Sequence, residues 1–153
     1  MQKTTLITVV LTLFVTLTSW AQFPAKPQLV KDPWTRTDLM APASLAAMIK
    51  NSKGSKPIIF NIGVVENIKG ARNMGGASEK ENLERFKKAL SSISKTSTVV
   101  VYCGCCPFER CPNIRPAFIA LKAAGFKNGK LLNLPTNIKV DWINKGYPVE
   151  PKS

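Results

Sequence analysis

Mostly apolar runs of strand length recur along the chain and are separated by longer, more polar segments. The runs cover residues 57–63, 98–102 and 130–134, and the middle run is built of β-branched and aromatic residues, which favour strands. Continuous rather than alternating apolarity is typical of parallel strands that are covered on both faces. The pattern therefore predicts a buried parallel sheet, to which Leu39-Met40 adds a short strand.

Segments with apolar side chains at helical spacing lie between these runs. The spacing predicts helices over 42–50, after a capping box at Ser78-Glu79-Lys80-Glu81, over 117–124, and from Thr136 to about 143. Residues 64–77 are rich in glycine and are predicted to be irregular. Strands and helices that alternate in this way predict an α/β fold, with a mostly parallel central sheet and helices on both faces.

The position of Cys103 follows from this fold class. Ligands of open α/β sheets bind outside the carboxyl ends of the strands. Cys103 comes directly after the run 98–102, the strand expected nearest the centre of the sheet. We therefore expect the site to lie at this residue.

The N-terminus has the layout of a secretory signal peptide. Lys3 precedes an uncharged apolar stretch, and Ser19-Trp20-Ala21 places small residues where a signal peptidase cleaves. An uncleaved membrane anchor is the alternative, because the uncharged stretch is just long enough to span a bilayer. Cleavage near Ala21 predicts a secreted or periplasmic protein.

The predicted organisation has three parts. A signal peptide occupies residues 1–21, a proline-containing extended arm occupies 22–37, and the folded domain occupies 38–150.

Composition narrows the chemistry further. The chain has no histidine, which excludes a Ser-His-Asp triad, a Cys-His pair and a His-ligated metal. Its formal net charge is +13, but the lysines are scattered, so we read them as a solvated surface. We expect no nucleic-acid partner, because an exported protein does not normally meet one.

All four cysteines lie in one short segment, between Cys103 and Cys111. The order strand, cysteine, tight loop and helix start makes an anion site from loop amides and the helix dipole. The same field favours the thiolate of Cys103, and Gly104 lets the backbone curl around the sulfur. Arg110 and Arg115 are candidates to hold an oxyanion.

Other thiol chemistries compete with this interpretation. Cys103 and Cys106 form a C-x-x-C motif, but too little chain follows it for a thioredoxin fold, although dithiol chemistry remains open. Six residues separate Cys103 from Arg110, one more than in a Cys-x5-Arg phosphatase loop. Four thiolates can bind zinc or copper, although the adjacent Cys105 and Cys106 suit a tetrahedral ion poorly. A structural disulfide from Cys105 or Cys106 to Cys111 is also open.

The order and spacing of several segments resemble the single-domain rhodanese family of sulfurtransferases. The resemblance covers roughly Asp38 to Glu150, and the C-G-C-C-P-x-x-x-C-P-N loop is similar to that of a subset of exported rhodanese-like proteins. The matching segments are Ile58–Ile62, Ile68-Lys69-Gly70-Ala71, Val99–Cys103, Ala120–Phe126, and Trp142 with Gly146–Glu150.

The chain also departs from the family pattern. Asn61-Ile62-Gly63 replaces the usual Asp-x-Arg, Asn67 stands where a histidine is common, and Thr136-Asn137 replaces a glycine pair. The loop after Cys103 is longer than the family's short cradle.

The resemblance implies a rhodanese-like three-layer fold and sulfur transfer without a cofactor or a bound metal. Cys103 would take the outer sulfur of a small anionic donor such as thiosulfate, release sulfite, and pass the sulfur from its persulfide to a thiol or to cyanide. The resemblance implies that amides of the loop hold the persulfide together with Arg110. The residues of this loop are Gly104, Cys105, Cys106, Pro107 and Phe108.

The extra cysteines suggest a variation on this mechanism. Cys106 or Cys111 would resolve the persulfide and leave a disulfide for a partner protein to reduce. A different class of function is a thiol–disulfide redox or metal-binding protein on the same scaffold.

Overall fold

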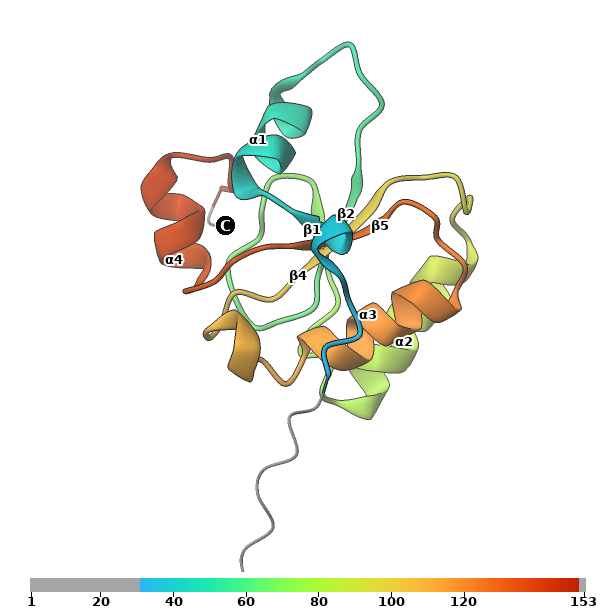
Figure 1. Cartoon of the computed structure of the whole chain (residues 1–153). Coiled ribbons are helices and arrows are strands. Elements are labelled where there is room, and N and C mark those ends of the chain that lie inside the picture. The colour runs from blue at the N-terminus through green and yellow to red at the C-terminus, as the bar shows by residue number, and fades with distance from the viewer. Residues whose placement is uncertain (1–30, 152–153) are drawn as a thin grey trace, which may run out of the picture. The chain divides into compact units, whose positions relative to one another are not determined.

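The computed structural model describes residues 31–151 (Figure 1). The predicted signal peptide, residues 1–21, lies outside the described residues, and so does the first part of the predicted arm, residues 22–30. The end of the arm, Arg36–Asp38, forms a 3₁₀ turn.

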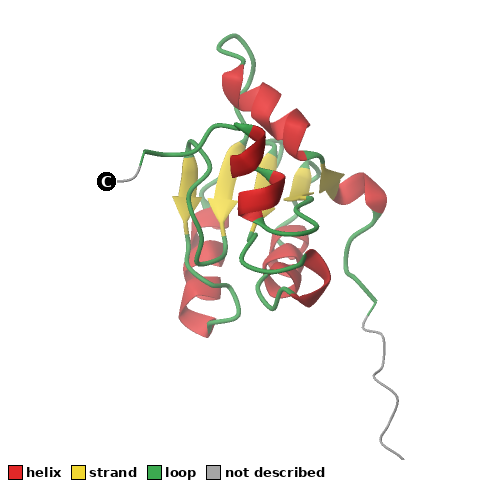
Figure 2. Ribbon diagram, turned by 90° about the vertical axis from the view of Figure 1, so that its left-hand side faces the viewer, coloured by secondary structure: helices red, strands yellow, loops and turns green. Residues whose placement is uncertain are grey.

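The centre of the protein is a five-stranded sheet with the strand order β1-β5-β4-β2-β3. Every pair of neighbouring strands is parallel, as the continuous apolar runs predict (Figure 2). The strands are β1 (Leu39–Met40), β2 (Ile58–Asn61), β3 (Ala71–Asn73), β4 (Val99–Tyr102) and β5 (Gly129–Leu132). The predicted central position of β4 is confirmed, because it pairs with β2 on one side and β5 on the other.

Helices cover both faces of this sheet. Helices α1 (Pro42–Lys50) and α4 (Ile138–Asp141) pack on one face, and α2 (Lys80–Ser91) and α3 (Ile114–Ala123) pack on the other (Figure 1). This confirms the predicted α/β class with helices on both faces. None of the helices in residues 31–151 has the length and hydrophobicity needed to cross a membrane.

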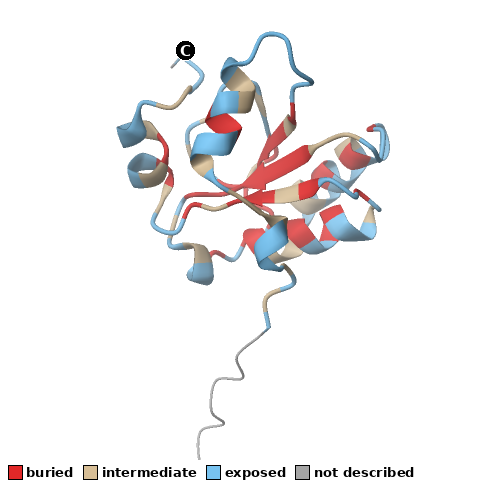
Figure 3. Cartoon of the chain, turned by 45° about the horizontal axis from the view of Figure 1, so that its top comes forward, coloured by how far each residue is buried: buried red, intermediate tan, exposed pale blue. Residues whose placement is uncertain are grey.

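Strand β4 divides its side chains between two hydrophobic layers. Val99 and Val101 pack with α2 and α3, and Cys103 continues this side of the strand. Val100 and Tyr102 pack with α1 and α4. All residues of β4 are buried (Figure 3), which explains why this strand has no polar alternation.

Strand β3 was missed by the sequence pattern, which predicted that residues 64–77 are irregular. The strand has three residues, lies at the edge of the sheet, and pairs Ala71 with Ile59. Arg72 and Asn73 are exposed, so no hydrophobic period marks the strand.

Two predicted helix starts are wrong. Helix α2 begins after Glu79, and neither Ser78 nor Glu81 forms the predicted capping box there. The backbone N–H of Ser78 instead donates to the side chain of Asn113, across the loop that carries the cysteines. Helix α4 is capped by Asn137 rather than Thr136, since the Asn137 side chain accepts a 2.9 Å hydrogen bond from the backbone N–H of Val140.

The last predicted helix is also shorter than expected. Helix α4 ends at Asp141, and a separate 3₁₀ turn, Ile143–Lys145, follows it. Gly146 then reverses the chain in the left-handed conformation, at φ 68°.

Candidate functional site

Cys103 lies at the carboxyl end of β4, as the sequence predicts. Only 1% of the residue is exposed, and it packs in the layer formed with α2 and α3. The loop after β2 passes directly against it, since a Cβ built on Gly63 would come within 2.6 Å of the Cys103 sulfur. A glycine at position 63 therefore lets the ends of the two neighbouring strands close over the thiol.

The tight turn after Cys103 also depends on a glycine. Gly104 has a φ of 76°, in the left-handed region, and a Cβ there would lie 2.8 Å from the Cβ of Ile138. The Gly104 carbonyl accepts a 2.9 Å hydrogen bond from the Ile138 backbone N–H at the start of α4. The turn thus fastens the cysteine loop to the opposite face of the sheet.

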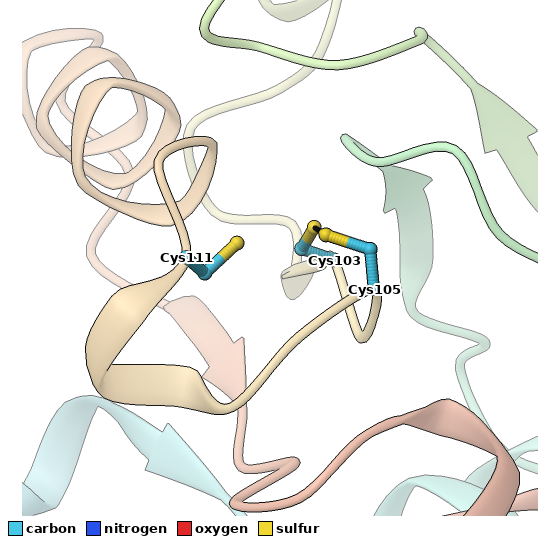
Figure 4. A group of neighbouring side chains, drawn as sticks. All are labelled: Cys103, Cys105 and Cys111. Atoms are coloured by element: carbon cyan, nitrogen blue, oxygen red, sulfur yellow. Dashed lines mark hydrogen bonds between the residues drawn. The ribbon is translucent and has the colours of Figure 1, made fainter.

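Three cysteine sulfurs converge in this loop. The Sγ atoms of Cys103, Cys105 and Cys111 all lie within 4.8 Å of one another, and we call these residues the thiol trio (Figure 4). The Cys103 and Cys105 sulfurs are 3.1 Å apart, and the Cys111 side chain points toward them from the loop before α3. Cys103 and Cys111 are buried, whereas Cys105 is exposed.

Cys106 lies at the edge of the trio. Its sulfur is 3.5 Å from that of Cys105, and the residue is partly buried. The described residues include all four cysteines of the chain, and no disulfide joins them.

Asn113 connects the trio to the loop before α2. This side chain is buried, and its Nδ2 atom donates to the sulfurs of Cys103 at 3.4 Å and Cys105 at 4.0 Å. Its Oδ1 atom accepts a 2.8 Å hydrogen bond from the backbone N–H of Ser78. No role for Asn113 follows from the sequence, although its place at the end of the C-G-C-C-P-x-x-x-C-P-N loop sets it apart from the other asparagines.

The hydrogen bonds favour the thiolate of Cys103. The Cys111 thiol makes the largest contribution, and the Cys105 backbone N–H, the Cys105 thiol and the Asn113 amide also donate. These donors outweigh burial, which opposes charge, and lower the pKa of the Cys103 thiol to about 6.

The pKa values of the two neighbouring thiols, Cys105 and Cys111, shift in the opposite direction. Burial, with the hydrogen bond to Cys103, raises the pKa of the Cys105 thiol to about 12. The hydrogen bond to Cys103 raises the pKa of the Cys111 thiol far above its ordinary value, and burial adds to the effect. The trio therefore holds one negative charge at neutral pH, on Cys103.

The sequence predicts that loop amides and the start of α3 favour the Cys103 thiolate, and the structure agrees with this only in part. Backbone N–H groups of Asn113 and Ile114, at the start of α3, favour the thiolate of Cys111 rather than that of Cys103. Of the loop amides, that of Cys105 acts on Cys103 as predicted, together with the neighbouring thiols and Asn113.

The two arginines lie in different surroundings. Arg115 forms a 2.6 Å ion pair with Asp32, and its guanidinium lies 5.4 Å from the centre of the Trp34 ring. Arg110 is exposed on the 3₁₀ turn Phe108–Arg110. Arg110 is therefore the arginine that is available to an external anion.

Residues of the N-terminal arm hold the cysteine loop in place. The Trp34 ring packs edge-on against Phe108 at 5.1 Å and Phe118 at 6.0 Å between ring centres. Phe108 belongs to the loop and Phe118 to α3, so Trp34 ties the two together. Pro107, which precedes this 3₁₀ turn, is exposed.

A cavity of about 590 Å³ lies away from the trio, where β2 and β3 begin. None of the cysteines lines this cavity, so we place the candidate site at the trio and not at the cavity. The residues around the cavity include Lys50, Lys56, Lys69 and Glu150.

Comparisons of the chain with protein-family models, with curated proteins and with solved structures found no match.

Proposed function

We propose that this chain is an exported sulfurtransferase of the rhodanese-like type, in which Cys103 carries the transferred sulfur as a persulfide. The observation that carries the proposal is the placement of Cys103 at the carboxyl end of the central strand, with the Cys105 sulfur 3.1 Å, the Asn113 amide 3.4 Å and the Cys111 sulfur within 4.8 Å of its sulfur. The export signal and the resemblance to the rhodanese family support the same conclusion from the sequence.

The first half-reaction loads the sulfur. The Cys103 thiolate attacks the outer sulfur of thiosulfate, the S–S bond of the donor breaks, and sulfite leaves with the electron pair. Cys103 is only 1% exposed, and the exposed Cys105 sulfur lies 3.1 Å from its sulfur, so we infer that the donor enters past Cys105. Arg110 attracts the donor, and loop amides between Gly104 and Cys106 hold the persulfide. Pro107 has no N–H, and the Phe108 N–H is bonded to the Pro135 carbonyl, so these two residues only shape the loop.

The second half-reaction unloads the sulfur. A thiolate or cyanide attacks the outer sulfur of the persulfide, and Cys103 leaves as a thiolate. The hydrogen bonds from Cys111 and Asn113 make this thiolate a good leaving group.

A resolving step is the second route for the bound sulfur. Of the two resolving candidates, Cys111 belongs to the thiol trio and Cys106 does not. The Cys111 sulfur attacks the inner sulfur of the Cys103 persulfide, the S–S bond of the persulfide breaks, and a Cys103–Cys111 disulfide forms. The Cys111 proton passes to the outer sulfur, which leaves as hydrosulfide. A dithiol partner then reduces this disulfide.

The test uses the purified protein, thiosulfate and cyanide. We expect thiocyanate to form, and the intact mass of the thiosulfate-treated protein to increase by one sulfur atom. Cys103→Ser should lose both signals. Cys106→Ser is the matched control and should keep both, because Cys106 lies outside the trio.

The outcomes separate the alternatives. Full activity in Cys103→Ser would show that the nucleophile is another residue. A disulfide that forms with thiosulfate in the wild type and disappears in Cys111→Ser would support the resolving step. A stable persulfide without any disulfide would exclude it.

A further inference from the structure

We propose that Cys103, Cys105 and Cys111 form a three-thiolate site for one Cu(I) ion. The site goes beyond sulfur transfer, because it needs no sulfur donor and its occupancy is measured without any activity assay.

The distances within the trio suit a single ion. A zinc–sulfur bond is about 2.3 Å long, and three sulfurs around one ion at such a distance lie about 3.8 Å apart in tetrahedral and about 4.0 Å apart in trigonal coordination. The trio has 3.1 Å between Cys103 and Cys105 and no more than 4.8 Å between any two of its sulfurs. Shifts of about an ångström or less therefore bring all three onto one ion.

The hydrogen bonds that Asn113 makes to the trio are a second, independent observation in favour of a metal site. The Nδ2 atom of the buried Asn113 donates to both Cys103 and Cys105. Donors of this kind orient ligand sulfurs and offset their charge, as groups outside the ligand shell do in metal sites.

The number and type of ligands select the ion. Thiolates are soft ligands and favour Cu(I), zinc and iron–sulfur clusters. Structural zinc and iron–sulfur clusters take four protein ligands, whereas the trio supplies three, and Cys106 does not join it. Zinc bound by three protein ligands keeps a water as its fourth ligand, whereas three soft thiolates suffice for Cu(I), so we assign the site to Cu(I) and use zinc as the competing ion in the experiment.

Burial suggests how the ion enters. Cys103 and Cys111 are buried, and Cys105 is exposed beside them. Cys105 is therefore the first ligand that an incoming Cu(I) meets, and the other two sulfurs complete the site. The ion stays Cu(I) throughout, and the thiol protons that it displaces go to solvent.

Cu(I) binding and sulfur transfer should exclude each other at Cys103. The Cys103 sulfur cannot bind Cu(I) as a thiolate and carry a second sulfur atom together. A chain loaded with Cu(I) should therefore take up no sulfur from thiosulfate.

The experiment is an anaerobic titration of the reduced protein with Cu(I) against a chromogenic Cu(I) chelator. We expect one Cu(I) per chain. Cys105→Ser should weaken binding by more than about 100-fold, because it removes a ligand, and Asn113→Ala by about 10-fold. Cys106→Ser, the matched control, should bind as the wild type does. Cys105 is exposed, so its replacement does not disturb the core as that of the buried Cys111 would.

Three results would overturn the proposal. The first is removal of all Cu(I) from the wild type by the chelator. The second is an equal weakening of Cu(I) binding in Cys105→Ser and Cys106→Ser. The third is one Zn(II) per chain that Cu(I) does not displace. Each result is independent of the thiocyanate assay, so this proposal and the sulfur-transfer proposal fail separately.

Discussion

The side-chain amide of Asn113 lies 3.4 Å from the sulfur of Cys103 and donates a hydrogen bond to it. The Ser78 backbone N–H donates to the Oδ1 atom of the same amide. This bond orients the amide so that its Nδ2 group faces the Cys103 thiol. Ser78 and Asn113, which are 35 positions apart, thus together fix the donor that faces the Cys103 sulfur. The same Asn113 side chain also donates to Cys105.

Asn113→Ala should raise the pKa of Cys103. A hydrogen bond to a charged group contributes about 1.5–3 kcal/mol, and Asn113 is the smallest of the contributions to the Cys103 pKa, so we expect a rise of about one pKa unit. The measurement is the pH dependence of alkylation of Cys103 in a Cys106→Ser background. Asn128→Ala is the control, because this exposed asparagine bonds to Thr96, away from the trio. An unchanged midpoint in Asn113→Ala would contradict the assigned role.

The reactivity of Cys103 should change with pH well below the range of an ordinary thiol. Because its pKa is lowered to about 6, the thiolate fraction rises between about pH 5 and 7 and is lost below that window. Cys105, with a pKa raised to about 12, should stay a thiol throughout. Alkylation followed by peptide mass spectrometry distinguishes the two residues. A Cys103 midpoint above pH 8 would show that the thiol donors do not act as described.

Gly63→Ala should destabilise the protein and disturb Cys103. The new Cβ would lie 2.6 Å from the Cys103 sulfur and 3.2 Å from its Cα, so backbone as well as side chain must move. Overpacking of this kind costs about 1–3 kcal/mol, to be measured by urea unfolding. Gly54→Ala is the control, because its Cβ would meet only the end of the Asn51 side chain. Wild-type stability and Cys103 reactivity in Gly63→Ala would count against the close packing.

Trp34→Ala should loosen the cysteine loop. The substitution removes the edge contacts to Phe108 and Phe118 and the ring beneath Arg115. We expect a loss of about 2 kcal/mol in the free energy of unfolding, less than for a fully buried tryptophan. Hydrogen exchange of the loop amides should become faster than in Arg36→Ala, an exposed neighbour of the same arm. Equal exchange in the two variants would mean that Trp34 does not hold the loop.

The parts of the fold that were predicted correctly have strong local signals. The run that became β4 is apolar at every position because both of its faces are covered, and this marks it as central. Helix α1 agrees with its predicted bounds, with Pro42 at its first turn. Strand β3 has no such signal, since it is a short polar edge strand held by its pairing with β2.

The capping prediction at Ser78 failed for a related reason. The Ser78–Glu81 pattern favours a local capping box, but the backbone of Ser78 bonds to Asn113 instead. A contact between distant segments replaced the local one, and only the packed chain shows that the two segments meet.

The amino-acid sequence by itself determined the α/β class, the central strand, and the position of Cys103 at that strand's end. These follow from residue type and local periodicity, which act over a few neighbouring residues. The tertiary structure decided which thiols surround Cys103, that Asn113 serves two of them, and that Arg115 is paired with Asp32. Such contacts depend on how an irregular loop folds against the ends of β2 and β4, and no local pattern encodes that path.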